Sequence, residues 1–103
     1  MTNNIKEIEK RIEKFLNKSL EKKKYFKNET TFNFIEGWFN DFFIFNYNFF
    51  NTDSLSKKRN EINYILELLI INEKYNEFEV ETLNCLVNFI DEYIKILLLQ
   101  EKE

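Results

Sequence analysis

Apolar residues recur at helical spacing in three stretches of the chain. The clearest stretch runs from about Asn4 to Phe26, where one face of a helix is apolar and the other is densely charged. Its apolar face consists of Ile5, Ile8, Ile12, Phe15, Leu16 and Leu20. This spacing predicts an amphipathic first helix.

Two further helices are predicted in the second half of the chain. One follows the capping residues Asn51-Thr52-Asp53-Ser54 and runs from Leu55 to about Asn72. Its buried face is predicted from Leu55, Ile62, Ile65, Leu66 and Leu69, and Tyr64, Leu68 and Ile71 widen the apolar arc, which is typical of a central helix. The other begins near Asn76, has glutamates in its first turns, and repeats apolar residues to Leu99.

The stretch Thr31 to Phe50 fits two structures. As a helix capped by Thr30 or Thr31, it has an apolar side; as strands, the alternation in 45–49 and a turn at Glu36-Gly37 suit a β-hairpin. The helix is favoured because Glu-Gly is a poor hairpin turn and the neighbouring segments are helical.

These segments together predict an all-α fold, a compact bundle of about four helices in a single domain spanning residues 1–103. The alternative is an α+β fold with a β-hairpin in residues 31–50. With 103 residues and 44% hydrophobic content, the chain is long and apolar enough to form a real core.

Aromatic residues are concentrated in one part of the chain. Of the 12 Phe, 5 Tyr and 1 Trp, two-thirds lie between Tyr25 and Phe50. If Thr31 to Phe50 is a helix, its core face is expected to be Phe32, Ile35, Phe39, Phe42 and Phe43. Phe34, Trp38 and Phe45 are then expected on the exposed flank, where aromatic residues mark a protein interface or a contact between copies of the chain.

Charge is unevenly distributed along the chain. Residues 1–29 carry a net charge of +4 and residues 30–103 a net charge of −7, and residues 61–92 hold eight acidic side chains against one basic residue, Lys74. An acidic surface attracts basic proteins and speeds their association. Glu73, Glu77 and Glu81 are therefore predicted to contact a basic partner.

Basic residues provide two weaker signals. The cluster Lys18, Lys22–Lys24 and Lys27, with Tyr25 and Phe26, has the composition of a phosphate-contact site, but no nucleic-acid motif accompanies it, so nucleic-acid binding is not favoured. Lys57, Lys58 and Arg59 occupy the first turns of a predicted helix, where the helix dipole disfavours positive charge.

The side chains that most catalysis requires are scarce. The chain has no His, one Cys and one Gly, and no acidic pair at the three-residue spacing of carboxylate metal sites in bundles. The sequence predicts no enzyme, no metal site and no cofactor. Cys85, as a single cysteine, cannot form an internal disulfide and is expected to be buried. A lone thiol indicates a reducing, cytoplasmic location. No signal peptide and no membrane-spanning segment is predicted.

The function that best fits these features is that of a small cytoplasmic immunity or inhibitor protein, which neutralises a toxin or effector by occluding it. The chain is rich in residues that have A/T-rich codons, such as Phe, Ile, Asn and Lys, which suggests a low-GC mobile element. An equivalent alternative is therefore a phage-encoded inhibitor of a host defence nuclease. Two other classes remain open: a self-associating structural or assembly protein, and a nucleic-acid-binding accessory protein.

Overall fold

The protein is an all-α bundle of four helices, as the sequence predicts. The computed structural model describes residues 2–44 and 51–101. The helices are α1 (Thr2–Glu21), α2 (Glu29–Ile44), α3 (Thr52–Ile71) and α4 (Glu77–Glu101), with a short 3-10 helix η1 (Lys23–Tyr25) between α1 and α2. No strand occurs in the described ranges, so the hairpin alternative is wrong for 29–44; positions 45–50 lie outside the described residues.

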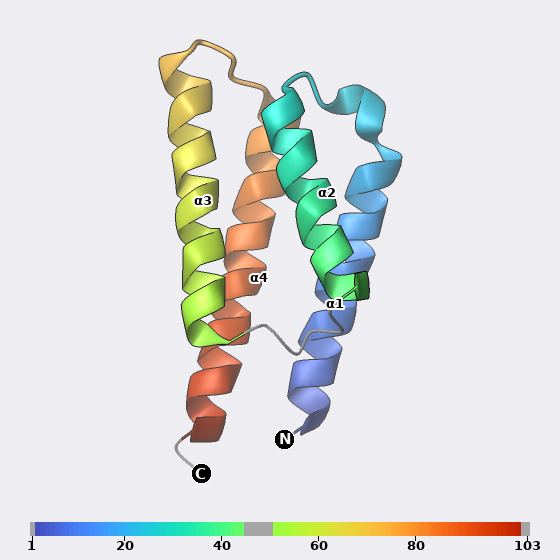
Figure 1. Ribbon diagram of the computed structural model, residues 1–103, viewed down its shortest axis with the longest axis vertical. Helices are drawn as coiled ribbons and strands as arrows, with labels where there is room; N and C mark the ends of the chain where they lie inside the picture. Colours follow the sequence, from blue (N-terminus) through green and yellow to red (C-terminus); the bar gives the residue numbers. More distant parts are fainter. Residues whose placement is uncertain (1, 45–50, 102–103) are drawn as a thin grey trace.

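The four helices alternate in direction along the bundle (Figure 1). Both ends of the chain lie at one end of the bundle, here called the terminal end, whereas η1 and the turn between α3 and α4 lie at the other, here called the loop end. Close backbone contacts join α3 with α4, α4 with α1, and α1 with α2. Helices α2 and α3 are therefore the two outer members of this series.

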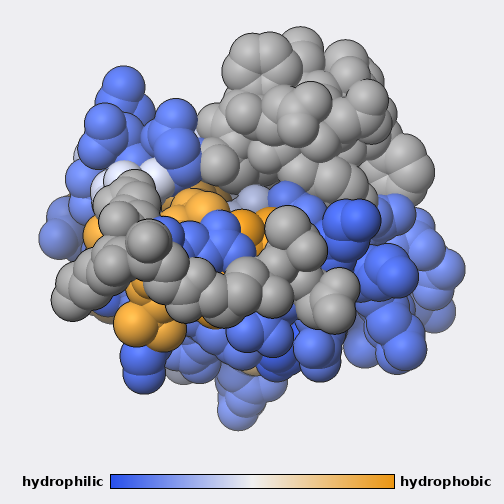
Figure 2. Space-filling view, turned by 90° about the horizontal axis from the view of Figure 1, so that it is seen from below, coloured by the Kyte–Doolittle hydropathy of each residue, from blue (hydrophilic) through white to orange (hydrophobic). Residues whose placement is uncertain are grey.

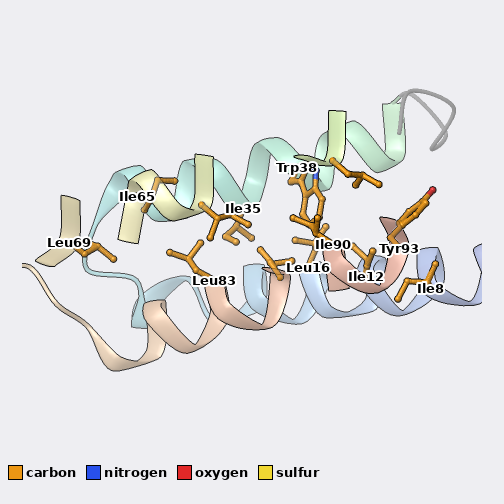
Figure 3. Packing of buried hydrophobic residues seen from close by; sticks show 13 residues of the cluster. Ile8, Ile12, Leu16, Ile35, Trp38, Ile65, Leu69, Leu83, Ile90 and Tyr93 are labelled. Carbon is orange, nitrogen blue, oxygen red and sulfur yellow. The ribbon is translucent and has the colours of Figure 1, made fainter. Parts of the chain in front are cut away.

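The core is formed by one apolar face of each helix. Helix α1 contributes Ile8, Ile12 and Leu16, and α3 contributes Leu55, Ile62, Ile65 and Leu69, which are the faces predicted from periodicity. Leu83, Leu86, Ile90 and Tyr93 from α4, with Ile35 and Trp38 from α2, complete the buried set, and Figure 3 shows these side chains converging between the helices.

Local side chains define the start of α3 and α4. Asn51 caps α3 in a reciprocal capping box, in which each side chain of Asn51 and Ser54 accepts from the other's backbone N–H at 2.9 Å. The Asn76 side chain accepts from the Glu79 N–H at 3.0 Å at the start of α4. Both caps agree with the helix starts predicted from the sequence to within a few residues.

The end of α1 comes earlier than predicted. The helix stops at Glu21 rather than near Phe26, and the chain tightens into η1. The N–H groups of Lys22 and Tyr25 donate to carbonyls three residues earlier, those of Ser19 and Lys22. These short-range bonds satisfy helix-end carbonyls while turning the lysine-rich segment toward α2.

Helix α3 ends in a strained turn. The N–H of Lys74 donates to the Leu69 carbonyl and that of Glu73 to the Ile70 carbonyl, the bonding pattern of a Schellman motif. Its left-handed position, which normally favours glycine, is occupied by Glu73 with a φ of 56°. A residue with a Cβ costs about 1 to 2 kcal/mol in this conformation.

Trp38 overturns the predicted orientation of α2. Its side chain is fully buried (0% exposed), and Figure 3 shows it pointing from α2 into the core toward Ile90. Phe39, expected in the core, is only partly buried. Among the α2 side chains that the structure describes, the buried stripe is Thr31, Ile35 and Trp38, so the prediction that Trp38 lies on an exposed flank is wrong. The side chains of Phe42 and Phe43, also predicted in the core, lie outside the described residues.

Two other burial predictions are also wrong. Cys85 is exposed rather than buried, because it lies on the side of α4 away from the core residues Leu83 and Leu86. Helix α3 is not central: Tyr64 and Ile71 are 61% and 72% exposed, so the wide apolar arc is not explained by burial.

The position of Trp38 leads to a direct prediction. Trp38→Ala should lower the free energy of unfolding by about 3 to 5 kcal/mol, because truncating a fully buried aromatic residue leaves a cavity. Phe39→Ala should cost less, since its side chain is partly exposed. Thermal unfolding measures both. The native fluorescence should be blue-shifted and resistant to acrylamide; a red-shifted, readily quenched signal would contradict the buried position.

Candidate functional site

A buried carboxylate organises the loop end of the bundle. Glu79 is 0% exposed, and its Oε2 accepts from the backbone N–H groups of Lys27 at 2.9 Å and Asn28 at 3.3 Å. The Asn28 Nδ2 group also donates to both carboxylate oxygens, at 3.2 and 3.1 Å. The carboxylate on α4 thus caps the start of α2, where the helix dipole favours negative charge.

Asn28 extends this network to the turn after α3. Its Nδ2 donates to the Lys74 carbonyl at 3.1 Å. One side chain therefore connects the start of α2, the start of α4 and the turn that contains Glu73. The predicted caps, Thr30 and Thr31, lie inside α2, which begins at Glu29, and the Glu79 carboxylate binds the two N–H groups directly before it.

Four large apolar side chains remain exposed on α3 and in the turn that follows it. Ile70 and Ile71 close the helix at 65% and 72% exposure. Tyr64 lies about two turns earlier at 61%, and Tyr75 lies in the turn at 62%. Together these four residues are called the outer set.

The acidic residues predicted to bind a partner lie at the same end of the bundle. Glu73 is in the turn after α3, and Glu77 and Glu81 lie one turn apart in the first turns of α4. All three are exposed. The structure thus brings Glu73, Glu77 and Glu81 into the segment that also contains Tyr75.

Other acidic residues of the 61–92 region have structural roles. Asp91 accepts from Arg59 at 2.8 Å, and Glu92 pairs with Arg11 at 3.0 Å. The acidic surface predicted from sequence is therefore narrower than the whole region. The other exposed carboxylates of the region, Glu61, Glu67, Glu73, Glu77 and Glu81, lie on α3 and at the loop end.

The predicted aromatic residues of α2 are not brought together with these carboxylates. Trp38 is in the core, and Phe34 is partly buried, with the Lys58 Nζ 5.6 Å from its ring centre. Phe45 lies outside the described residues. Of the predicted aromatic flank, only Phe34 remains a partly exposed candidate.

Two of the three basic residues in the first turns of α3 pair with acidic residues on other helices. Lys58 on α3 pairs with Asp41 on α2 at 3.3 Å as well as lying over Phe34, and Arg59 pairs with Asp91. Lys57 is exposed. The cost of placing Lys58 and Arg59 near a helix start is thus offset by pairing between helices.

The aromatic residues beside the lysine cluster pack on one another. The Phe26 ring contacts those of Phe32 and Phe78 edge-on, with centres 5.3 and 5.1 Å apart, and Tyr25 lies 5.7 Å from Phe78. Lys23 lies over the Phe32 ring. Stacking on Phe26 is therefore not free for a nucleic-acid base, which weakens that alternative.

A groove lies between the start of α2 and the end of α3. Its volume is about 320 Å³, and it is open to solvent. Its wall contains α2 residues together with Lys27 and Lys74, and its apolar side is formed by Ile65, Leu68 and Leu69. Leu68 lies one turn from both Tyr64 and Ile71, so the groove adjoins the outer set.

A second polar contact lies in the interface between α1 and α4. The Tyr93 hydroxyl donates to Glu9 Oε2 at 2.5 Å. Burial raises the pKa of the Glu9 carboxyl, and the Tyr93 hydrogen bond and the Lys6 charge oppose this effect. Because the folded pKa lies above the ordinary value, ionising Glu9 opposes folding: the cost is absent well below pH 4.5, grows between pH 4.5 and the folded pKa, and is complete above the folded pKa.

Neither a metal centre nor a membrane span is found in the described part of the chain. Among residues 2–44 and 51–101, no three acidic or cysteine side chains gather as metal ligands would. The described helices include none that is both long and apolar enough to cross a bilayer. The absence of a catalytic role stays a prediction.

Comparison with known proteins adds no further assignment. No protein-family model, no curated protein and no solved structure matches this chain.

The Glu79 network can be tested by its effect on stability. Glu79→Ala should lower the free energy of unfolding by about 1 to 3 kcal/mol, because it leaves the part-buried N–H groups of Lys27 and Asn28 without this acceptor. Glu79→Gln, which keeps one acceptor oxygen, should cost less. Urea unfolding measures both changes.

The matched control is Glu77→Ala, two residues earlier on α4 and exposed. Its cost should stay within about 1 kcal/mol, the size of a charge effect at a helix end. Equal losses for Glu77→Ala and Glu79→Ala would contradict the capping role.

Proposed function

We propose that this chain is a non-enzymatic inhibitor or immunity protein that binds a basic protein partner through the loop end of the bundle. The outer set provides the apolar contact, and the neighbouring carboxylates provide charge complementarity. The partner is neutralised because the bundle covers its working surface. A phage-encoded inhibitor of a nuclease belongs to the same physical class and uses the same contact.

The observation that supports this proposal is the exposure of four large apolar side chains in one short segment. Tyr64, Ile70, Ile71 and Tyr75 are each between 61% and 72% exposed. Single exposed apolar residues are normal, but a group of them rimmed by polar residues is typical of a protein interface. Tyrosine is also among the residues enriched at the energetic centres of interfaces.

Charge around the outer set favours a basic partner. Glu61 and Glu67 lie on α3 beside these residues, Glu73 and Glu77 follow, and all four are exposed. A basic protein approaching this end is attracted before contact, which raises its association rate. The apolar contacts then slow its dissociation.

Backbone strain at Glu73 supports a role for the same turn. Glycine at this left-handed position would relieve the strain, yet the chain has a glutamate there. Strained residues that persist in a protein are often found at functional sites. A carboxylate that contacts the partner accounts for the presence of Glu73.

The opposite end of the bundle offers a natural comparison. Figure 2, which views the terminal end, shows apolar surface among hydrophilic residues. Leu98 and Leu99 of α4 are 46% and 55% exposed there. The charged residue in the turn before them, residues 94–97, is Lys95, which is exposed.

Self-association through α3 is a second candidate function. Tyr64, Leu68 and Ile71 follow the four-then-three spacing of a coiled-coil seam, so the same surface suits a helix of a second copy. In that case the bundle would be an assembly protein. Analytical ultracentrifugation distinguishes this candidate, because it requires a dimer that the Ile71→Lys variant abolishes.

The inhibitor proposal is tested with paired surface variants. The partner is captured from the native host with the wild-type protein and identified, and its activity is then titrated with purified variants. Ile70→Lys/Ile71→Lys should weaken binding by about 30-fold or more, the loss expected when an interface anchor worth at least about 2 kcal/mol is removed. Leu98→Lys/Leu99→Lys, at the terminal end, should neutralise the partner like the wild type.

Glu73→Gly provides a second arm in which stability and binding move in opposite directions. The variant should be more stable by up to about 1 kcal/mol, because the strain is relieved, and should bind the partner more weakly. The proposal is wrong if the Leu98/Leu99 variant loses the partner while the Ile70/Ile71 variant retains it.

A further inference from the structure

The groove between α2 and α3 combines hydrogen-bond donors with an apolar wall. Its donor side is the first turn of α2, residues 29–31, whose N–H groups have no acceptor within the helix. The Glu79 carboxylate takes the N–H groups of Lys27 and Asn28, which precede this turn. The donors of 29–31 therefore remain for another group.

Thr31 supplies an independent sign of a ligand. Its side chain lines the groove and is 0% exposed, and its Oγ1 has no hydrogen-bond partner among the described residues. A buried hydroxyl without a partner is costly, and such groups in native proteins call for an explanation. A ligand that accepts a hydrogen bond from Thr31 provides one.

Charged side chains at the groove select the kind of acceptor. Lys27 and Lys74 both line it, and both are exposed enough to reach a ligand. Glu29 also lines the groove and is equally exposed, so these three side chains together leave one net positive charge (two lysines and one glutamate). The Glu79 carboxylate already accepts from the Lys27 and Asn28 N–H groups and from the Asn28 side chain. Two ammonium groups and a helix start together favour a carboxylate over a neutral acceptor.

The opposite wall of the groove indicates which chemical group accompanies the carboxylate in the ligand. Ile65, Leu68 and Leu69 provide an apolar surface across from the donors. A ligand that fills the groove therefore needs an apolar group directly beside its carboxylate. The carboxyl end of a polypeptide with apolar final residues has this arrangement.

We propose that this groove binds the chain-terminal carboxylate of a protein partner, with the apolar side chain of the last residue against Leu68 and Leu69. Thr31 Oγ1 and the first-turn N–H groups of α2 donate to the carboxylate, and Lys27 and Lys74 neutralise it. The inference rests on the proposed function, because the groove adjoins the outer set and both are contacted by one partner.

The test uses a defined probe rather than the unidentified partner. N-acetyl-leucyl-leucine, which has a free carboxylate, is titrated into the ¹⁵N-labelled full chain, and its carboxamide is titrated in parallel. The carboxylate form should give saturable shifts at the amides of Thr30, Thr31 and Leu69. The carboxamide should bind at least about tenfold more weakly, the usual difference for a charge-assisted hydrogen bond.

Thr31→Val separates binding from structure. The variant should melt at a higher temperature than the wild type without ligand, because a buried hydroxyl without a partner is replaced by a methyl group, and should bind the carboxylate peptide about tenfold more weakly. The matched control is Thr82→Val. Thr82 is also buried, but its hydroxyl donates to the Phe78 carbonyl at 2.8 Å, so this variant should melt lower and bind normally.

Three results would overturn the assignment: no saturable shifts at the groove, equal binding of the carboxylate and carboxamide forms, or unchanged peptide affinity in Thr31→Val. A further titration uses hexanoate. If hexanoate binds as tightly as the peptide, the ligand of the groove is a small amphiphile and not a chain terminus. If the groove does not bind the carboxylate peptide, the proposal that the outer set binds the partner is unaffected, because the Ile70→Lys/Ile71→Lys variant tests that surface separately.

Discussion

The structure depends on how it accommodates the buried carboxylate of Glu79. An ionised side chain removed from water is costly unless enough donors replace the lost hydration. Two backbone N–H groups and the Asn28 amide provide these donors, and the start of α2 adds a favourable dipole. Because the donors lie 51 and 52 residues away in sequence, the carboxylate fixes α4 relative to α2. Asn28 also holds the Lys74 carbonyl, so the turn after α3 is fixed as well.

This constraint makes the two ends of the bundle different. At the loop end, three segments are tied into one polar network, and on this rigid base the chain exposes the outer set and holds Glu73 in a strained conformation. A site held by rigid elements presents its contact residues without a large ordering cost on binding. In the function proposed above, the network, the exposed apolar residues and the groove with Thr31 are parts of one binding end.

Much of the fold could be predicted because it depends on local patterns. The stripe of α1, the Asn51 capping box and the Asn76 cap are encoded within a few residues. The orientation of α2 could not be obtained this way. When Thr31 is treated as the cap, it does not count as a helical residue. The buried stripe that Thr31 forms with Ile35 and Trp38 is then missed. The segment before α2 is held by Glu79, and periodicity carries no information about a contact from a distant helix.

The candidate site was only partly accessible from sequence for a related reason. Net charge along the sequence selected Glu73, Glu77 and Glu81, but their position at the loop end comes from the structure. Periodicity cannot separate an apolar residue that is buried from one that is exposed. Tyr64 and Ile71 therefore suggested a central helix, whereas their exposure places them on the surface. The most direct test of the loop end as the binding surface is photo-crosslinking in the native host, with benzoylphenylalanine at Tyr75 or, as a control, at Leu99. The account predicts an adduct with one basic protein from position 75 and none from position 99; adducts from position 99 alone would contradict it.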